Sequence, residues 1–422
     1  LLGFGTLFMY LGYHTQSFIC ESIIHSVHLE DPQRISTYAG YYGLFTASLH
    51  HYLTSKWILI LSTILFAVYY LGFFYINSYY FYVYNNGEGA YLAEHSSRRT
   101  VESNTGIETA IGHTSMLVGG LALLLIFNIC PDEQSEEVSN FRSFSDSQIK
   151  AIYGTFFGLS VMSVVIFALL PTRQYDSIAS NSPRVIPSFR NHFVSLAKTS
   201  IHTNMVLLFF TFFYMGVLVS FVLGIYPTAI SFTASFARDA NVVALYSTLA
   251  GLAEFSGGVF VRPLIKRCHS YKLIVTIALH FFIVVIALAL VQLSVPERAT
   301  IEPTDGNAIW FTPSSSRTIT CVFGYLMGLA DFTLTMTRVV ICQKAVPQHR
   351  MEVFSLTRIY QCIASCIVLF LSPYLTVTTW TIVLLLSLLI GTSCLVVVVR
   401  RTNNSDDVVS PIEHIATMEK SS

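Results

Sequence analysis

Residues 242–261, VVALYSTLAGLAEFSGGVFV, form a nearly unbroken apolar run with one carboxylate, Glu254, near its midpoint. A helix needs about 20 predominantly apolar residues to cross the roughly 30 Å of hydrocarbon in a bilayer. Ala250, Gly251 and Gly258 lie close to Glu254 on such a helix, and small residues let a second helix approach closely. The run therefore predicts a membrane-spanning helix whose Glu254 face points into a bundle of helices.

The composition of the whole chain predicts the same environment. Of its 422 residues, 53% are hydrophobic and only 11% are charged, whereas a soluble domain carries about a quarter of charged residues. A lipid bilayer removes the need for a polar surface, and the long, unbroken runs differ from the short alternating strands of a membrane β-barrel. We therefore predict an integral, multi-pass protein of the plasma membrane or an endomembrane, with the lipid bilayer as its first partner.

Apolar runs of similar length recur along the chain. We predict spans at 2–22, 36–53, 57–75, 77–93, 105–128, 150–170, 204–230, 241–261, 271–294, 318–342, 353–374 and 377–399. The run at 77–93 is the weakest of these, because it is short and contains Asn85, Asn86 and Glu88. The pattern predicts an all-α polytopic fold of about twelve transmembrane helices, with a short or truncated fourth span.

The distribution of Lys and Arg predicts the orientation and the division of the chain. With the N-terminus in the cytoplasm, the cytoplasmic connections hold a clear excess of basic residues, as the positive-inside rule requires. If the fourth run did not cross, every later connection would change sides and the excess would reverse, so a segment must cross there.

The longest cytoplasmic connection separates six predicted spans from six others, which is similar to the layout of the major facilitator superfamily fold. We therefore expect an N-terminal six-helix half at 1–170 and a central cytoplasmic loop at 171–203. A C-terminal six-helix half at 204–400 and a disordered cytoplasmic tail at 401–422 complete the chain.

Several classes of function find no support in the sequence. The net charge is zero, so no nucleic-acid partner is indicated. The eight cysteines are scattered, none forms a metal-ligand pattern with His, and no nucleophile–base pair appears. We expect no enzyme activity, no metal and no cofactor.

Ionisable residues inside the spans are the candidate functional residues of the C-terminal half. A carboxylate at a helix centre costs roughly 2.5–3.5 kcal/mol on insertion scales, so it usually faces protein or water. Glu254 and Asp331 lie near the midpoints of their spans. Arg338 and Arg358 lie nearer the cytoplasmic ends, and each either extends to the lipid headgroups or forms a partnership with a buried carboxylate.

The N-terminal half holds three further candidates. His14 and Glu21 are seven residues apart in the first span and share a helix face, and His113 lies well inside the fifth. A histidine at that depth is either neutral and hydrogen-bonded to a neighbouring helix or a carrier of protons. The two classes of explanation, coupling sites of a transporter and buried contacts that fix helix registry, both remain open.

Several stretches together resemble the uncoordinated-93-like family, a divergent branch of the major facilitator superfamily. They are GFGTLFMYLGYHTQSFICESIIHSV at 3–27, GEGAYLAEHSSRRTVESNTGIETAIGHTSMLVGG at 87–120, GLAEFSGG at 251–258, GYLMGLADFTLTMTR at 324–338 and EVFSLTRIYQC at 352–362. The element at 87–120 is the most specific, and the order of the stretches matches the family over most of the chain. The family has a full helix before the G-x-G element, whereas the fourth run is short here.

This resemblance implies that the chain has the fold of a transporter but acts on another membrane protein, as a regulator or an escort. Family members include a regulatory subunit of two-pore potassium channels and a trafficking chaperone of Toll-like receptors. SLHHYLTSKW, at 48–57, also stands where transporters of the superfamily carry a basic loop. We expect a regulatory subunit or trafficking escort of another membrane protein, such as a potassium channel. The alternative is a proton- or sodium-coupled secondary transporter of a small solute.

Overall fold

The computed structural model describes most of the chain. The described residues are 1–30, 55–75, 101–129, 146–170, 189–237, 239, 241–261, 272–310 and 316–419. The predicted spans at 36–53 and 77–93 lie outside them.

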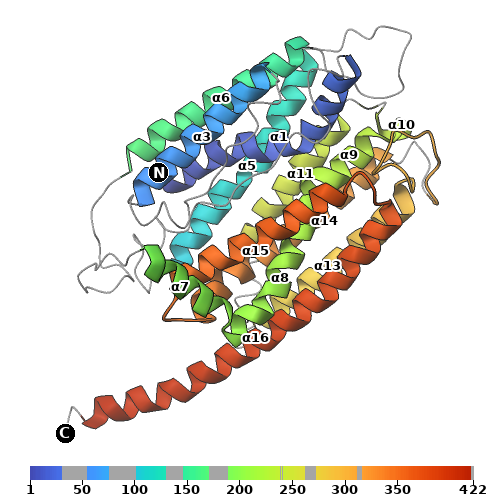
Figure 1. The fold of residues 1–422 in the computed structure, drawn as a ribbon. Coiled ribbons are helices and arrows are strands. Elements are labelled where there is room, and N and C mark those ends of the chain that lie inside the picture. Colours follow the sequence, from blue (N-terminus) through green and yellow to red (C-terminus); the bar gives the residue numbers. More distant parts are fainter. Residues whose placement is uncertain are drawn as a thin grey trace.

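Four helices form the N-terminal part of the bundle (Figure 1): α1 (Leu2–Glu30), α3 (Ser55–Tyr75), α5 (Val101–Ile129) and α6 (Asp146–Ala168). Helix α1 packs against α5 and α6, and α3 packs against α6. Each helix covers all or nearly all of one predicted span, because an apolar run surrounded by lipid can satisfy its backbone hydrogen bonds internally only as a helix.

The C-terminal part contains the remaining long helices: α8 (Thr203–Ser220), α11 (Val242–Ser256), α13 (Lys272–Ser294), α14 (Ser316–Lys344), α15 (Arg350–Leu371) and α16 (Val377–Glu419). Helix α8 packs against α15 and α16, and α13 packs against α14 and α16. Helix α8 continues through a π-helical turn, η2 (Phe221–Ile225), into α9 (Tyr226–Ser231). Pro227 lies in the first turn of α9. Because proline lacks the amide hydrogen of a regular helix, the irregular turn directly before it has a local cause.

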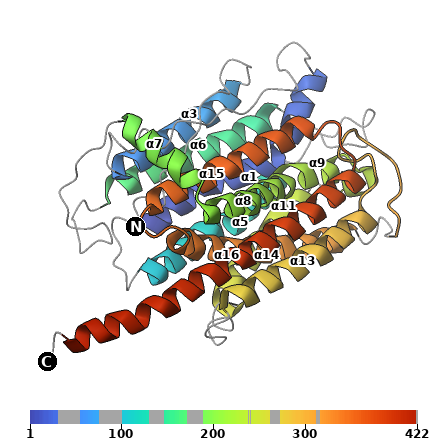
Figure 2. The ribbon, with the colours of Figure 1, turned by 60° about the horizontal axis from the view of Figure 1, so that its bottom comes forward.

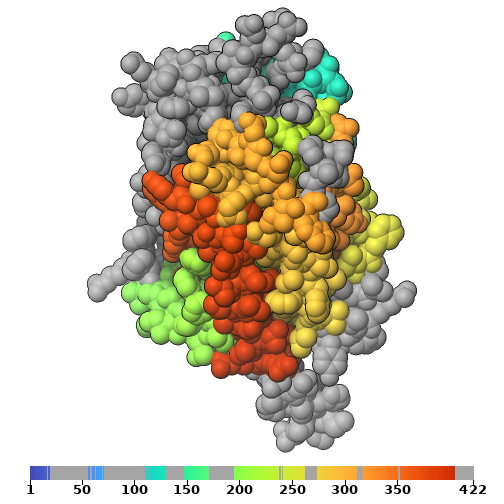
Figure 3. Space-filling view, turned by 90° about the vertical axis from the view of Figure 1, so that its right-hand side faces the viewer, coloured from blue at the N-terminus to red at the C-terminus, as the bar shows by residue number. Residues whose placement is uncertain are grey.

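Length and apolar composition make this bundle a multi-pass membrane protein. Within the described part of the chain, seven helices are long and apolar enough to cross a membrane. Large apolar side chains such as Phe282 and Ile286 on α13 are exposed. In Figure 3, the red surface of α16 runs along one face beside the yellow and orange surfaces of α13 and the connection after it. An outer face with many exposed apolar side chains is favourable in contact with hydrocarbon and unfavourable in contact with water.

Helix α16 does not end where the sequence analysis placed the end of the last span. The helix runs from Val377 to Glu419, whereas a disordered tail was expected at 401–422. Figures 1 and 2 both show its C-terminal part projecting away from the other helices. Extending an existing helix by one residue avoids the unfavourable nucleation step, so the anchored segment can propagate into the polar sequence.

The predicted central loop also contains a helix, α7 (Phe189–Ser200). It packs against α15 and α8. The Ser195 hydroxyl donates a hydrogen bond of 2.9 Å to Glu352 Oε1 near the start of α15. The connection between the halves is thus attached to the predicted cytoplasmic end of the C-terminal half.

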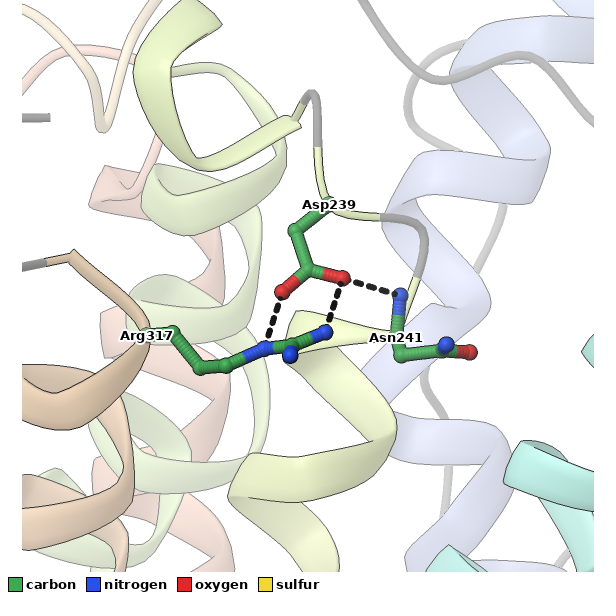
Figure 4. A network of polar contacts seen from close by, with 3 residues as sticks. All are labelled: Asp239, Asn241 and Arg317. Atoms are coloured by element: carbon green, nitrogen blue, oxygen red, sulfur yellow. Dashed lines mark hydrogen bonds and ion pairs between the residues drawn. The ribbon is translucent and has the colours of Figure 1, made fainter. Parts of the chain in front are cut away.

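An exposed ion pair joins the N-terminal ends of α11 and α14 (Figure 4). Arg317 donates from Nε to Asp239 Oδ2 at 2.5 Å and from Nη2 to Oδ1 at 2.9 Å. The amide of Asn241 donates to Asp239 Oδ1 at 3.1 Å. Because the pair is exposed, its contribution to the free energy of unfolding is at most about 1 kcal/mol.

A second polar link ties the connection after α13 to the start of α16. The hydroxyl and the amide of Thr378 donate to the Glu297 carboxylate at 2.5 and 3.3 Å, and the Val377 amide donates to the Glu297 carbonyl at 3.1 Å. Partial burial acts to raise the pKa of Glu297, but hydrogen bonds from the side chains of Thr376 and Thr378 and from the Thr378 amide outweigh it and lower the pKa.

The lowered pKa of Glu297 predicts how acid affects stability. A carboxyl group whose pKa is lower in the folded state stabilises the fold at pH values above its ordinary pKa of about 4.3. This stabilisation is lost as the pH falls through the lowered pKa of the folded state. We expect the thermal unfolding midpoint of Glu297→Gln to fall less than that of the wild type between pH 5 and pH 3. Asp305→Asn, in the same connection, is the control. Parallel pH profiles for Glu297→Gln and the wild type would contradict the assignment.

Candidate functional site between the two halves

Helix α11 forms the main contact between the two halves, because it lies between α5 of the N-terminal half and α14 of its own half. A Cβ atom at Gly251 would fall on the backbone of Leu117 in α5, and one at Gly328 would fall on the backbone of Ala250. Ser247 donates a hydrogen bond of 3.1 Å to the Met116 carbonyl. The small residues of 242–261 therefore allow α11 to touch a helix on each side.

Glu254 is buried in this contact region, with 3% of its surface exposed. The pairs Ala250–Gly328 and Gly257–Phe332 show that α11 and α14 run in parallel. Glu254 therefore lies at the level of Asp331, on the neighbouring helix. Asp331 itself keeps part of its surface accessible, so the two carboxylates predicted from the sequence share a depth but differ in exposure.

His14 belongs to a polar group on the N-terminal side of the boundary. Its Nδ1 lies 3.0 Å from Ser115 Oγ on α5, and its ring stacks on Tyr10 with centroids 5.2 Å apart. His14 and Tyr10 are both half-buried. The hydrogen bond and the stacked ring fix the imidazole against α5.

Arg338 lies near the end of α14 and Arg358 near the start of α15, both toward the predicted cytoplasmic end of the bundle. Helices α14 and α15 pack against each other, and both arginines keep part of their surface accessible. Arg358 Nη1 donates to Gln361 Oε1 at 3.2 Å.

Two of the predicted site residues cannot be placed in full. Glu21 lies on α1 and His113 lies on α5, but their side chains are outside the described part. The structure thus places Arg338 and Arg358 on two neighbouring helices, sets Glu254 and Asp331 at one level, and holds His14 against α5.

A buried hydrogen-bonded histidine, His280, was missed by the sequence analysis. The Tyr214 hydroxyl lies 2.7 Å from His280 Nε2, and His280 Nδ1 lies 3.0 Å from the Ala330 carbonyl and 3.2 Å from Thr333 Oγ1. One neutral tautomer satisfies the set, with Tyr214 donating to Nε2 and Nδ1–H donating to the carbonyl. The available signal was the position of His280 as the one titratable residue between Lys272 and Glu297.

The described residues place polar and charged side chains between packed helices, and they do not assemble a metal site. Among these residues, no group of three or more His, Cys, Asp or Glu side chains is arranged to hold a metal ion. The charged and polar groups near these helix contacts are carboxylates, guanidinium groups, phenols, hydroxyls and the imidazoles of His14 and His280. They can bind ions, protons or polar ligands, or they can fix the packing of the two halves.

Solved structures with a similar fold are membrane transporters. The chain matches FucP, a major facilitator superfamily transporter in the outward conformation, with a TM-score of 0.57 and 12% identity, over 94% of this chain and 97% of that one. A variant of FucP, described as the fucose:proton symporter of E. coli, matches with a TM-score of 0.55 and 14% identity, over 95% and 97% of the two chains. The predicted major facilitator superfamily fold is confirmed.

Relatives in sequence extend over nearly the full length. The chain is 23% identical to the UNC93-like protein MFSD11 of Xenopus laevis and to that of Xenopus tropicalis, in both cases over 93% of each chain. The family model described as "ion channel regulatory protein UNC-93" matches residues 31–396. Since that match covers most of both halves and the boundary between them, the chain belongs to the UNC-93 family.

Proposed function

We propose that this chain is a non-catalytic regulatory subunit or trafficking escort of another integral membrane protein, such as an ion channel. The description of the family model, an ion channel regulatory protein, supports this role. The main structural support is the close crossing of α5 and α11, where backbone lies against backbone at Gly251 and Leu117. Alternating access requires the halves to rock against each other around a central site, and a crossing this close favours a static assembly.

The partner is expected to bind the outer, lipid-facing surface. We expect the tagged chain, extracted in a mild detergent, to retrieve one defined membrane protein in a stoichiometric complex. Glu254→Gln should retain that partner, because Glu254 is buried between helices and away from the outer face. Recovery of only substoichiometric, varying proteins would contradict the proposal.

A second candidate, ion-coupled secondary transport of a small solute, rests on a different observation. Asp331 keeps accessible surface on α14 at the level of the buried Glu254, and substrate sites of transporters lie near the midplane between the halves. In proteoliposomes, uptake should then respond to an imposed proton or sodium gradient. Uptake that persists unchanged in Glu254→Gln and Asp331→Asn would exclude both carboxylates from coupling.

A further inference from the structure

We propose that α7 lies in the headgroup layer of the cytoplasmic leaflet and binds anionic lipid through its outer face. This outer face consists of Val194, Ala197 and Lys198 on α7 and of Ile201, which directly follows the helix. The inference goes beyond the proposed function, because a regulatory subunit and a transporter could each carry such a helix.

Two links fix α7 at the level where membrane-spanning helices begin. Only Ile201 and His202 separate the end of α7 from the start of α8 at Thr203. The Ser195 hydroxyl donates a hydrogen bond of 2.9 Å to Glu352, the third residue of α15. Since α8 and α15 both begin on the predicted cytoplasmic side, these links hold α7 at that surface of the membrane.

The direction and the length of α7 show that it runs along this surface. Figures 1 and 2 both show α7 crossing the direction of α16. Its 12 residues make a helix of about 18 Å, which is too short for the roughly 30 Å of hydrocarbon in a bilayer. The helix therefore lies across the end of the bundle.

The inner face of α7 is occupied by the bundle itself. Leu196 packs against the apolar core, Thr199 is buried, and Ser195 makes the hydrogen bond to Glu352. These three positions lie on one side of an α-helix. Only the opposite side of α7 is left for a partner.

The outer face is an apolar stripe with one long cation. Val194 has 42% of its surface exposed and Ile201 has 76%, and Ala197 and Lys198 are exposed as well. Residues at this spacing are neighbours along one face of a helix. Such a stripe is favourable at the boundary of headgroups and acyl chains, where a lysine can extend its ammonium group toward the headgroups.

The charge of this segment is complementary to an anionic membrane surface. Between Arg184 and His202 the sequence contains Arg184, Arg190 and Lys198 and no acidic residue. The cytoplasmic leaflet carries a negative surface potential that attracts basic segments next to membrane-spanning helices. The basic charge, the apolar stripe and the position at the membrane surface identify anionic lipid as the occupant, and a protein partner is the competing occupant.

The test measures hydrogen–deuterium exchange of residues 193–202 in the full chain, reconstituted in nanodiscs. Phosphatidylcholine alone is compared with phosphatidylcholine containing phosphatidylglycerol. Lipid bound to the folded helix opposes its local opening. We expect exchange in the anionic nanodiscs to be slower by about fivefold for each basic residue that reaches the headgroups. High salt should reduce this difference, because it screens exposed charges.

The variants assign the effect to the outer face. Lys198→Gln should reduce the slowing by phosphatidylglycerol about fivefold, and Ile201→Ser should speed exchange in both lipids. Both side chains are exposed, so neither change should prevent folding. Arg298→Gln is the matched control, because it removes an exposed charge from the predicted extracytoplasmic side, and it should exchange as the wild type does.

Three results would each overturn the proposal. The first is equal exchange of the wild type in the two lipids, which would leave the outer face to a protein partner. The second is a response of Lys198→Gln to phosphatidylglycerol as large as that of Arg298→Gln. The third is wild-type exchange in Ile201→Ser. Recovery of a partner from detergent depends on none of these results, so this proposal and the proposed function fail separately.

Discussion

Replacing Gly251 with alanine is expected to lower the free energy of unfolding by about 1–3 kcal/mol. A Cβ atom at this position would lie 2.6 Å from Leu117 Cα and 2.7 Å from the Met116 carbonyl carbon. Both are backbone atoms of α5, so no rotamer change can remove the clash. The two helices would have to separate, and the contact between the halves would loosen along with the hydrogen bond from Ser247 to Met116.

The control is Gly258→Ala in the π-helical turn η3 (Gly257–Val261) that continues the same span. There the nearest atom to an added Cβ is a Phe332 ring carbon at 3.9 Å, which is an ordinary contact. Since alanine is the better helix former by about 0.8–1 kcal/mol, Gly258→Ala should be neutral or slightly stabilising. Denaturant unfolding in detergent micelles measures both variants. If Gly251→Ala proves as stable as Gly258→Ala, the two halves do not meet at the α5–α11 crossing as the structure shows.

Much of this fold could be predicted from residues 242–261 and the runs like them. A run of about 20 apolar residues has few solutions in hydrocarbon, because every backbone polar group must be satisfied within the segment. The small residues around Glu254 predicted a face turned into the bundle, and the structure buries that carboxylate with 3% of its surface exposed. Local sequence was sufficient there, because the residues that allow close approach lie within two turns of the acid.

The pairings across the boundary could not be predicted, because they depend on residues far apart in the chain. Ser247 on α11 meets the Met116 carbonyl on α5, and no periodicity within one span indicates which helix lies opposite. The end of α16 was also misplaced. Polar composition indicated a tail, but composition does not show how far an anchored helix continues.

The role of His280 could not be predicted either, because its partners also lie far away in the sequence. From the sequence alone, a single histidine in an apolar run cannot be distinguished from a residue that only packs in the core. Only the fold shows that Tyr214 on α8 and the Ala330 carbonyl on α14 both reach it. The three helices α8, α13 and α14 therefore meet at one buried polar point, and His280 supplies both hydrogen-bonding atoms from α13.

Replacing His280 with leucine is expected to lower the free energy of unfolding by about 1–3 kcal/mol. Leucine keeps the site apolar and similar in size, but it leaves the Tyr214 hydroxyl without its acceptor. Tyr214 has no exposed surface and His280 has 2%, so water cannot replace the lost partner. Thr333 still donates to the Ala330 carbonyl at 2.8 Å, so the hydroxyl of Tyr214 should account for most of the loss.

This reasoning predicts a specific rescue. In the His280→Leu background, Tyr214→Phe removes the stranded hydroxyl and should recover part of the stability. A double-mutant cycle should therefore give a coupling energy of about 0.6–1.7 kcal/mol, which spans the average and the maximum measured for hydrogen bonds between membrane helices. Phe282→Leu, two residues from His280 and 64% exposed, should change little. If Tyr214→Phe and His280→Leu are simply additive, the hydrogen bond makes no net contribution, and the packing of apolar side chains alone holds α8, α13 and α14 together.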